Sequence, residues 1–154
     1  MKKLRTNKRI EGSFRDPSGF LYYKNGSIYR QVNKSYKENF NHLVNSNLYK
    51  TLVNDELLIP HEDAHIDAYD PHKVFKTISP AEIPFISYPY EWCFSQLKGA
   101  ALATLKTQKI ALEHGMCLKD SSAYNIQFRN GKPLLIDTLS FEIYQDGQPW
   151  TAYR

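Results

Sequence analysis

The spacing of apolar positions changes several times along the chain, and each change marks a predicted element. Two short runs of aromatic and β-branched residues lie within residues 20–32, on either side of the sequence Lys-Asn-Gly-Ser. Asn-Gly is a strong signal for a two-residue turn between antiparallel strands. The same arrangement returns in residues 125–137, where Asn130-Gly131 separates two short runs. The pattern therefore predicts two β-hairpins.

Two other stretches have the spacing of helices. In residues 35–58 most apolar side chains recur at steps of three and four, with Ser35 as the expected N-cap and an Asn-rich middle that weakens the helix. Residues 93–115 form a longer helical stretch, and Gly115 suits the position after a helix end. Its expected core face is the apolar stripe Phe94, Leu97, Ala101, Leu105 and Leu112.

The remaining segments complete an α+β layout with two unequal lobes. Residues 59–73 are predicted to form a loop, and 74–79 and 83–88 are predicted strands. We therefore expect three parts in chain order: a basic tail at 1–15, a small N-terminal lobe at 16–88 and a partial C-terminal lobe at 89–154.

The composition is that of a globular protein, with 42% hydrophobic and 23% charged residues among 154. The net charge of +4 is unevenly distributed, because the first ten residues hold five basic side chains and the rest is nearly neutral. A basic arm can contact nucleic acid, but a solvated terminus is the commoner case. Nucleic acid is therefore the least favoured partner.

The sequence gives three indications of compartment. It contains no apolar run of 18 residues, so we expect no membrane span. The basic start lacks the apolar region of a secretory signal. Cys93 and Cys117 are not in a Cys-x-x-Cys arrangement, and we expect free thiols in a cytoplasmic protein.

The second hairpin region carries the candidate chemistry. Asp120 and Asn125 are five residues apart in LKDSSAYN, and Asp137 ends the run PLLID. Phosphoryl transfer needs a carboxylate that accepts a hydroxyl proton and oxygen ligands that hold Mg²⁺. The loop can present Asp120 and Asn125 together, and the hairpin returns Asp137 beside Asn125. The alternative is turn chemistry, since Asp and Asn favour loops and caps.

The stretch LKDSSAYN resembles the catalytic loop of the protein-kinase-like superfamily, and LLIDTLS resembles its metal-binding Asp segment. Aminoglycoside-type phosphotransferases and small bacterial sugar or lipopolysaccharide kinases are similar here too. The resemblance implies a kinase-like two-lobe fold, with ATP and Mg²⁺ as cofactors. It implies Asp120 as the catalytic base and Asn125 and Asp137 as Mg²⁺ ligands, and it places residues 86–92 at the hinge between lobes.

The chain departs from that superfamily at several positions. Leu118 replaces the His or Tyr that normally precedes the loop Asp, and Leu139 replaces the Gly after the metal-binding Asp. The first hairpin has no Gly-rich phosphate loop and no evident strand lysine. Arg30 is the best cation on a predicted strand to replace that lysine, and Glu38 is its candidate partner from the first helix.

Two further residues are candidate nucleotide contacts. Glu91, next to Trp92 in the hinge-like segment, is expected to line a ligand cleft, although a packed aromatic corner is an equal alternative. Lys119, beside Asp120, is positioned in sequence to steady a phosphate or else to face solvent. The sequence HEDAH at 61–65 fits the zinc-protease pattern, but the prolines around it argue against the helix that this pattern requires.

A second resemblance covers most of residues 16–154. The stretches SYPYEWCFSQLKGAALATL, GMCLKDSSAYNIQF and PLLIDTLSFE resemble a bacterial family of larger proteins that is labelled nodulation-related or associated with SAM-dependent methyltransferases. Its members continue further, which implies that the C-terminal lobe is incomplete here. The chain has no Gly-rich strand-turn-helix for a nucleoside cofactor, so any methyltransferase domain is expected outside it.

Three hypotheses of function remain open. The first is an ATP- and Mg²⁺-dependent phosphotransferase, or the nucleotide-binding part of one, that acts on a small molecule or a glycan. The second is a non-catalytic, pseudokinase-type module associated with a methyltransferase domain or partner. The third is a nucleic-acid-binding module that uses the basic arm, with affinity that falls steeply with salt.

Overall fold

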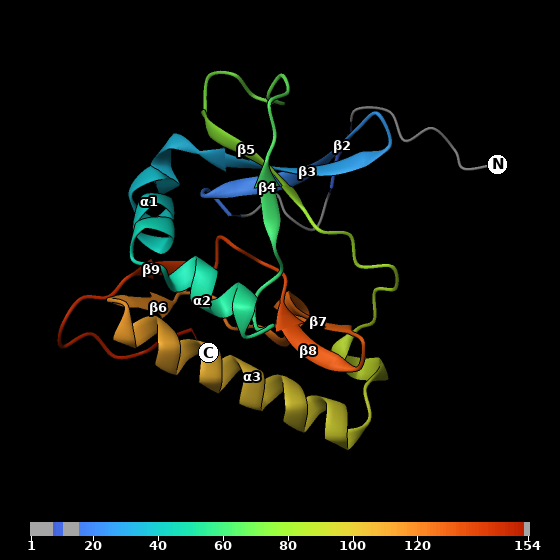
Figure 1. Ribbon diagram of the computed structural model, residues 1–154, viewed down its shortest axis with the longest axis vertical. Coiled ribbons are helices and arrows are strands. Elements are labelled where there is room, and N and C mark those ends of the chain that lie inside the picture. The colour runs from blue at the N-terminus through green and yellow to red at the C-terminus, as the bar shows by residue number, and fades with distance from the viewer. Residues whose placement is uncertain (1–7, 11–15, 153–154) are drawn as a thin grey trace. The chain divides into compact units, whose positions relative to one another are not determined.

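The structure is a computed structural model that describes residues 8–10 and 16–152 (Figure 1). In this part the chain has an α+β fold with three α-helices, one five-stranded sheet and two two-stranded sheets. The chain divides into two compact units. Unit 1 comprises residues 1–40 and 60–82, and unit 2 comprises residues 41–59 and 83–154.

Unit 1 is built on the five-stranded antiparallel sheet, in the order β1-β2-β3-β5-β4. Asn25 and Gly26 connect β2 to β3 with φ angles of 53° and 84°, which confirms the first predicted hairpin. Both angles lie in the left-handed region that a tight two-residue turn requires and that Asn and Gly tolerate best. The strand bounds are β1 Lys8–Arg9, β2 Gly19–Lys24, β3 Ser27–Asn33, β4 His61–Asp63 and β5 Val74–Pro80.

Aromatic rings cover one part of this sheet. Phe20 and Tyr22 are both buried, and each has its ring centroid 5.5 Å from that of Tyr69. The guanidinium of Arg9 lies 3.9 Å from the ring centroid of Phe20, so this residue of the expected basic tail belongs to the sheet. The rest of the tail, residues 1–7 and 11–15, lies outside the described part.

The first helical stretch is broken, as its Asn-rich middle predicted. A 3₁₀ turn, η2 (Lys34–Tyr36), leads into α1 (Lys37–Asn45), and α2 (Leu48–Asn54) follows. Asn47, with a φ of 64°, separates the two helices. The prediction of Ser35 as N-cap is wrong, because its hydroxyl donates to the carbonyl of Pro17 at 2.9 Å and the 3₁₀ turn has already begun.

Unit 2 combines one long helix, α3 (Phe94–Glu113), with two small sheets. β6 (Met116–Leu118) pairs with β9 (Phe141–Ile143), and β7 (Ile126–Arg129) forms a hairpin with β8 (Lys132–Leu135). Residues 57–59 also bond to β8: the Leu135 N–H donates to the Leu57 carbonyl at 2.8 Å, and the Ile59 N–H donates to the Leu135 carbonyl at 2.9 Å.

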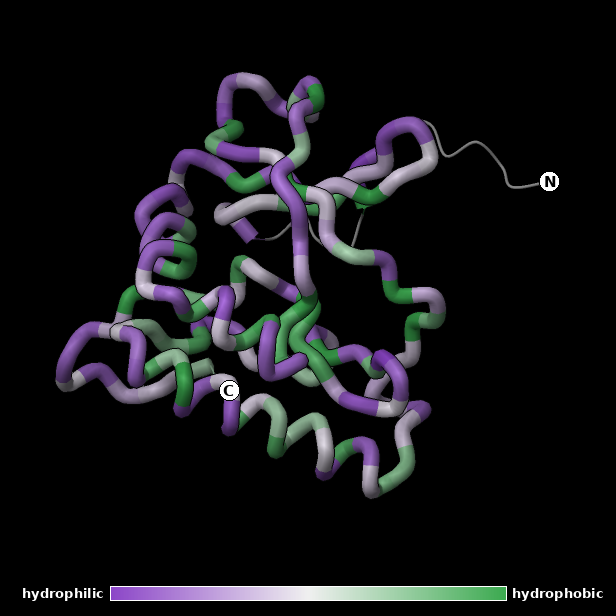
Figure 2. Tube along the Cα trace, in the orientation of Figure 1, coloured by the Kyte–Doolittle hydropathy of each residue, from purple (hydrophilic) through white to green (hydrophobic). Residues whose placement is uncertain are grey.

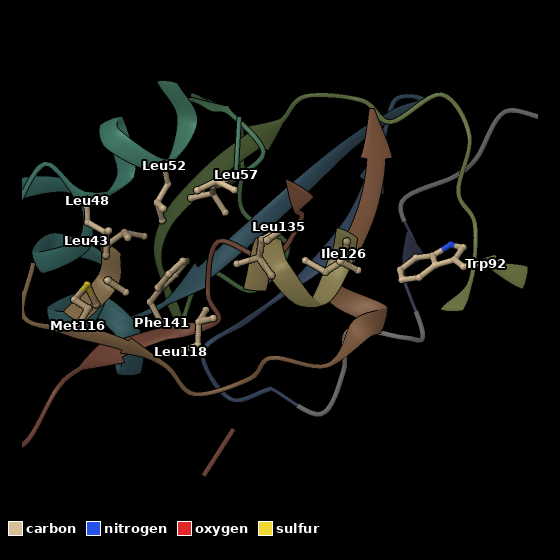
Figure 3. Packing of buried hydrophobic residues seen from close by; sticks show 14 residues of the cluster. Leu43, Leu48, Leu52, Leu57, Trp92, Met116, Leu118, Ile126, Leu135 and Phe141 are labelled. Carbon is tan, nitrogen blue, oxygen red and sulfur yellow. The ribbon is translucent and has the colours of Figure 1, made fainter. Parts of the chain in front are cut away.

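The core of unit 2 draws on every one of these segments (Figure 3). Helix residues contribute alongside strand residues because each small sheet has one apolar side to cover. The cluster contains Leu43, Leu48, Leu52, Leu57, Leu58, Trp92, Ala100, Ala103, Ala111, Met116, Leu118, Ile126, Leu135 and Phe141.

The predicted core face of α3 is wrong. The buried side carries mainly small residues, and the expected apolar stripe is exposed. Figure 2 shows that apolar and polar residues alternate along this helix. The β7–β8 hairpin packs against this side, where a Cβ on Gly99 would lie at the ordinary contact distance of 3.7 Å from Cγ of Pro133. The buried residues are Ala100, Ala103, Thr107, Gln108 and Ala111.

Three further expectations differ from the structure. Residues 83–88 do not form a strand, since Pro84 interrupts them and no neighbouring strand bonds to them among the described residues. Residues 59–73 contain β4 and are not wholly loop. The compact units do not divide at residue 88, because residues 41–59 supply leucines to the core of unit 2. No helix in the described ranges has the length and apolarity needed to cross a membrane.

Candidate functional site

The β7–β8 hairpin brings two of the three candidate residues together. Asn130 and Gly131 form its turn with φ angles of 53° and 76°, which confirms the predicted turn. Beyond the paired strands, the Ile136 N–H donates to the Asn125 carbonyl at 2.8 Å. Asn125 and Asp137 therefore lie at the open end of one hairpin, as the sequence predicted.

Asp120 is linked to the same region by a second pair of strands. β6 ends at Leu118, which pairs with Phe141 of β9. The next amide, that of Lys119, donates to the carbonyl of Ser140 at 2.8 Å. The Asn125 side-chain amide lies 3.5 Å from the Ser140 hydroxyl, which accepts this long hydrogen bond. Ser140, which is buried, thus connects the Asp120 segment to the hairpin.

Both carboxylates also take part in local turns. Oδ1 of Asp120 accepts the Ser122 N–H, and Oδ1 of Asp137 accepts the Leu139 N–H, each at 2.9 Å. Turn chemistry is thus present at both positions. It does not exclude a metal, because a carboxylate has about four acceptor sites on two oxygens. Asp120 is exposed, and Asp137 is half-buried.

The donor set at this place is two carboxylates and one amide. In the described ranges, no three His, Cys, Asp or Glu side chains lie together as a metal site. A divalent ion here would depend on the Asn125 amide oxygen as well as the two aspartates. Hard oxygen donors of this kind suit Mg²⁺, which is commonly held by one or two carboxylates with waters and phosphates.

Arg30 and Glu38 both belong to unit 1. Arg30 is buried in the middle of the sheet, where it pairs with Leu21 of β2 and Ile78 of β5. Glu38 is exposed in the first turn of α1. The ion pair expected between these two residues stays a prediction.

His61 shares the charged environment of Arg30. Burial lowers the pKa of His61 to about 4; Asp63 opposes this shift, while Lys76 and Arg30 add to it. Because His61 and Asp63 lie on strand β4, the HEDAH sequence is not the helix that the zinc-protease pattern requires.

In the hinge-like segment, Glu91 and Trp92 both have partners within the protein. Oε2 of Glu91 accepts the Tyr88 N–H at 2.7 Å and caps the 3₁₀ turn η3 (Pro89–Glu91). Trp92 is buried, donates its indole N–H to Ser87 at 2.9 Å and meets the Phe128 ring edge-on at 5.1 Å between centroids. For Trp92 the packed aromatic corner is therefore the correct alternative.

One cavity in unit 2 was not predicted from the sequence. Its volume is about 470 Å³. It lies beside the end of α3, and Glu142 and Trp150 are among the residues that line it. The Trp150 indole N–H donates to the Leu118 carbonyl at 2.9 Å, and burial raises the pKa of the neighbouring Cys117 thiol. No motif signalled this cavity, because its walls come from segments far apart in sequence.

No protein-family model matches the chain. The chain is similar to nodulation protein NoeA of Rhizobium meliloti (strain 1021). The two are 35% identical over 151 residues, and the match covers 95% of this chain and 31% of NoeA. The chain thus spans about a third of the length of NoeA. This match confirms the expected resemblance to nodulation-related proteins, while the kinase-like resemblance stays a prediction.

Proposed function

We propose that this chain is the Mg²⁺- and nucleotide-binding part of a kinase-like phosphotransferase whose acceptor is a small molecule or a glycan. The observation that carries the proposal is the hydrogen bond from the Ile136 N–H to the Asn125 carbonyl, which holds Asn125 and Asp137 at one hairpin end. The bond between Lys119 and Ser140 supports the inclusion of Asp120.

The residues fit the ion and the chemistry. Asn125 and Asp137 would hold Mg²⁺, which neutralises phosphate charge when bound. Asp120 would accept the proton of the acceptor hydroxyl, since it is exposed and its Oδ1 is oriented by the Ser122 N–H. Lys119, which is half-buried, would steady a phosphate next to that carboxylate.

The support for the other candidate nucleotide contacts differs from residue to residue. Arg30 would replace the missing strand lysine, because a guanidinium binds phosphate oxygens in pairs and always carries its charge. Glu38 would orient Arg30. Glu91 is a weaker candidate, since its carboxylate already accepts the Tyr88 N–H and would have to leave that cap to contact a nucleotide.

A non-catalytic, nucleotide-binding module is the second candidate. Its support is the burial of Leu118 and Leu139, both at most 1% exposed. These leucines occupy the positions where the kinase-like superfamily has a polar residue and a glycine, and buried leucines serve packing. Such a module would work beside another domain, of which a SAM-dependent methyltransferase is the expected kind, and NoeA is long enough to contain one.

The proposal is tested by thermal unfolding with and without ATP and Mg²⁺. A ligand that binds the native state raises the unfolding temperature. We expect a rise that needs both ATP and Mg²⁺ and is lost in Asp137→Ala. The exposed Asp146 offers a matched control, and Asp146→Ala should keep the full rise.

The turnover assay separates the two candidates. A phosphotransferase should release phosphate from ATP or modify an acceptor, and Asp120→Asn should abolish this while the thermal rise remains. A binding module should show the rise without turnover. If ATP and Mg²⁺ leave the unfolding temperature of the unaltered chain unchanged, both candidates are excluded. Salt-dependent binding to DNA or RNA would then favour the nucleic-acid hypothesis.

A further inference from the structure

The apolar stripe of α3 is exposed, although the sequence predicted that it would face the core. Phe94 is 81% exposed, Leu97 42%, Leu105 55% and Leu112 43%. They recur at helical spacing and therefore share one side of the helix with Ala101. Scattered apolar residues on a surface are normal, but a contiguous row along a 20-residue helix marks an interaction site.

The segment that leads into α3 also exposes large apolar side chains. Phe85 and Tyr90, in the segment that leads into α3, are 76% and 75% exposed. The other side of α3 is already occupied by β6, β8 and α2. The stripe is therefore additional to the face that the fold of unit 2 uses.

The charges beside the stripe indicate what covers it. Lys98 and Lys109 are exposed and lie next to Leu105 on the helical circumference. In a symmetric pair of antiparallel helices that cross at the middle of α3, residue 98 of one copy would meet residue 109 of the other. In a parallel pair each lysine would meet its own copy. Both arrangements oppose like charges, so a second copy of this chain is disfavoured.

We propose that the α3 stripe is the docking surface for a second protein domain, of the kind that makes up the part of NoeA that this chain does not match. That domain presents apolar side chains to Phe94, Leu97 and Leu105, with Asp or Glu at the edge facing Lys98 and Lys109. Because the match covers only 31% of NoeA, the rest of NoeA is long enough to contain such a domain. This inference does not rest on the proposed phosphotransferase function.

Cysteine labelling tests the proposal with intact proteins. Leu105→Cys is made in this chain, and the same change is made at the aligned position of full-length NoeA. Maleimide labelling of the new thiol is then followed by peptide mass spectrometry, which reads Cys93 and Cys117 separately. We expect labelling in NoeA to be about tenfold slower or more, because a covered site reacts only when it opens.

Matched variants make the test specific. Lys50 is exposed on α2, away from the stripe in sequence, and Lys50→Cys should label at similar rates in both proteins. Leu97→Cys repeats the measurement at a second place on the stripe. Equal labelling of both stripe positions in the chain and in NoeA would overturn the proposal.

Two other occupants give distinct results. If light scattering shows a dimer of this chain that Leu105→Asp dissociates, the occupant is a second copy. If the chain sediments with vesicles of phosphatidylcholine and phosphatidylglycerol and Leu105→Asp abolishes this, the occupant is a lipid surface. Either result would replace the docked domain.

Discussion

Oε1 of Gln108 accepts the backbone N–H of Leu118 at 2.7 Å, and both residues are buried. This bond joins α3 to β6, two residues before Asp120. A buried amide needs a hydrogen-bond acceptor, so the glutamine fixes where the candidate catalytic segment begins.

Replacement of Gln108 should therefore be costly. In Gln108→Leu, which keeps a similar size, the buried amide of Leu118 loses its acceptor, and we expect the free energy of unfolding to fall by about 1–3 kcal/mol. Urea unfolding measures this change. Gln145 is exposed, and Gln145→Leu should alter stability by less than about 0.5 kcal/mol. Equal effects of the two substitutions would contradict the role of Gln108.

Stability should depend on the protonation of His61. Burial lowers its pKa from 6.5 to about 4 in the folded state, so the unfolded chain binds the proton more tightly. The full contribution to stability is present above pH 6.5 and is lost as the pH falls toward 4, by about 3 kcal/mol at most. Urea unfolding of the unaltered chain and of His61→Gln across this range measures it. The control is His65→Gln, at an exposed position. A pH slope that survives His61→Gln unchanged would refute the assignment.

Residues 41–59 should behave as part of unit 2. Leu52 is fully buried in the core of that unit, and Leu52→Ala should cost about 2–5 kcal/mol. Val44, which is 42% exposed on α1, is the control, and Val44→Ala should cost much less. Hydrogen exchange should show faster opening of β7 and β8 in Leu52→Ala. Acceleration confined to β2 and β3 would place the helix with unit 1 instead.

Two glycines should respond in opposite directions to alanine. Gly131 has a φ of 76°, which is strained for any side chain, so Gly131→Ala should lower stability by about 1 kcal/mol although nothing lies within 4 Å of the added carbon. Gly99 lies within α3, where its Cβ would make an ordinary contact at 3.7 Å with Pro133. Gly99→Ala should raise stability by about 0.5–1 kcal/mol. Thermal unfolding of both variants is the measurement, and stabilisation by Gly131→Ala would be inconsistent with the turn described.

Local chemistry explains which elements could be predicted. Both hairpins follow from Asn-Gly, whose turn geometry depends on those two residues alone, and the bounds of α3 follow from its spacing and Gly115. The buried face of α3 does not, because periodicity identifies an apolar side but not the neighbour that covers it. Strands β6 and β9 have three residues each. They form by pairing with each other across about 25 positions of sequence, which a local pattern cannot reveal.

In the candidate site, too, the local arrangement could be predicted from the sequence and the long-range pairing could not. Asn125 and Asp137 come together because one turn separates them. The connection of Asp120 through Ser140 needs the β6–β9 pairing, which leaves no local signal in the sequence. The placement of Arg30 near His61 depends on three strands that are contributed by separate segments.

The division of the chain into two units has a consequence for folding during translation and for proteolysis. The chain passes from unit 1 to unit 2 after Phe40, returns after Ile59 and leaves again after Glu82. Neither unit is a continuous segment, so neither can be completed before the other has begun. The sheet of unit 1 must wait for β5 to emerge from the ribosome, while α1 and α2 wait for α3. A cut at any one point therefore damages at least one unit. The two units are expected to be inherited together, in agreement with a match to NoeA that covers 95% of this chain.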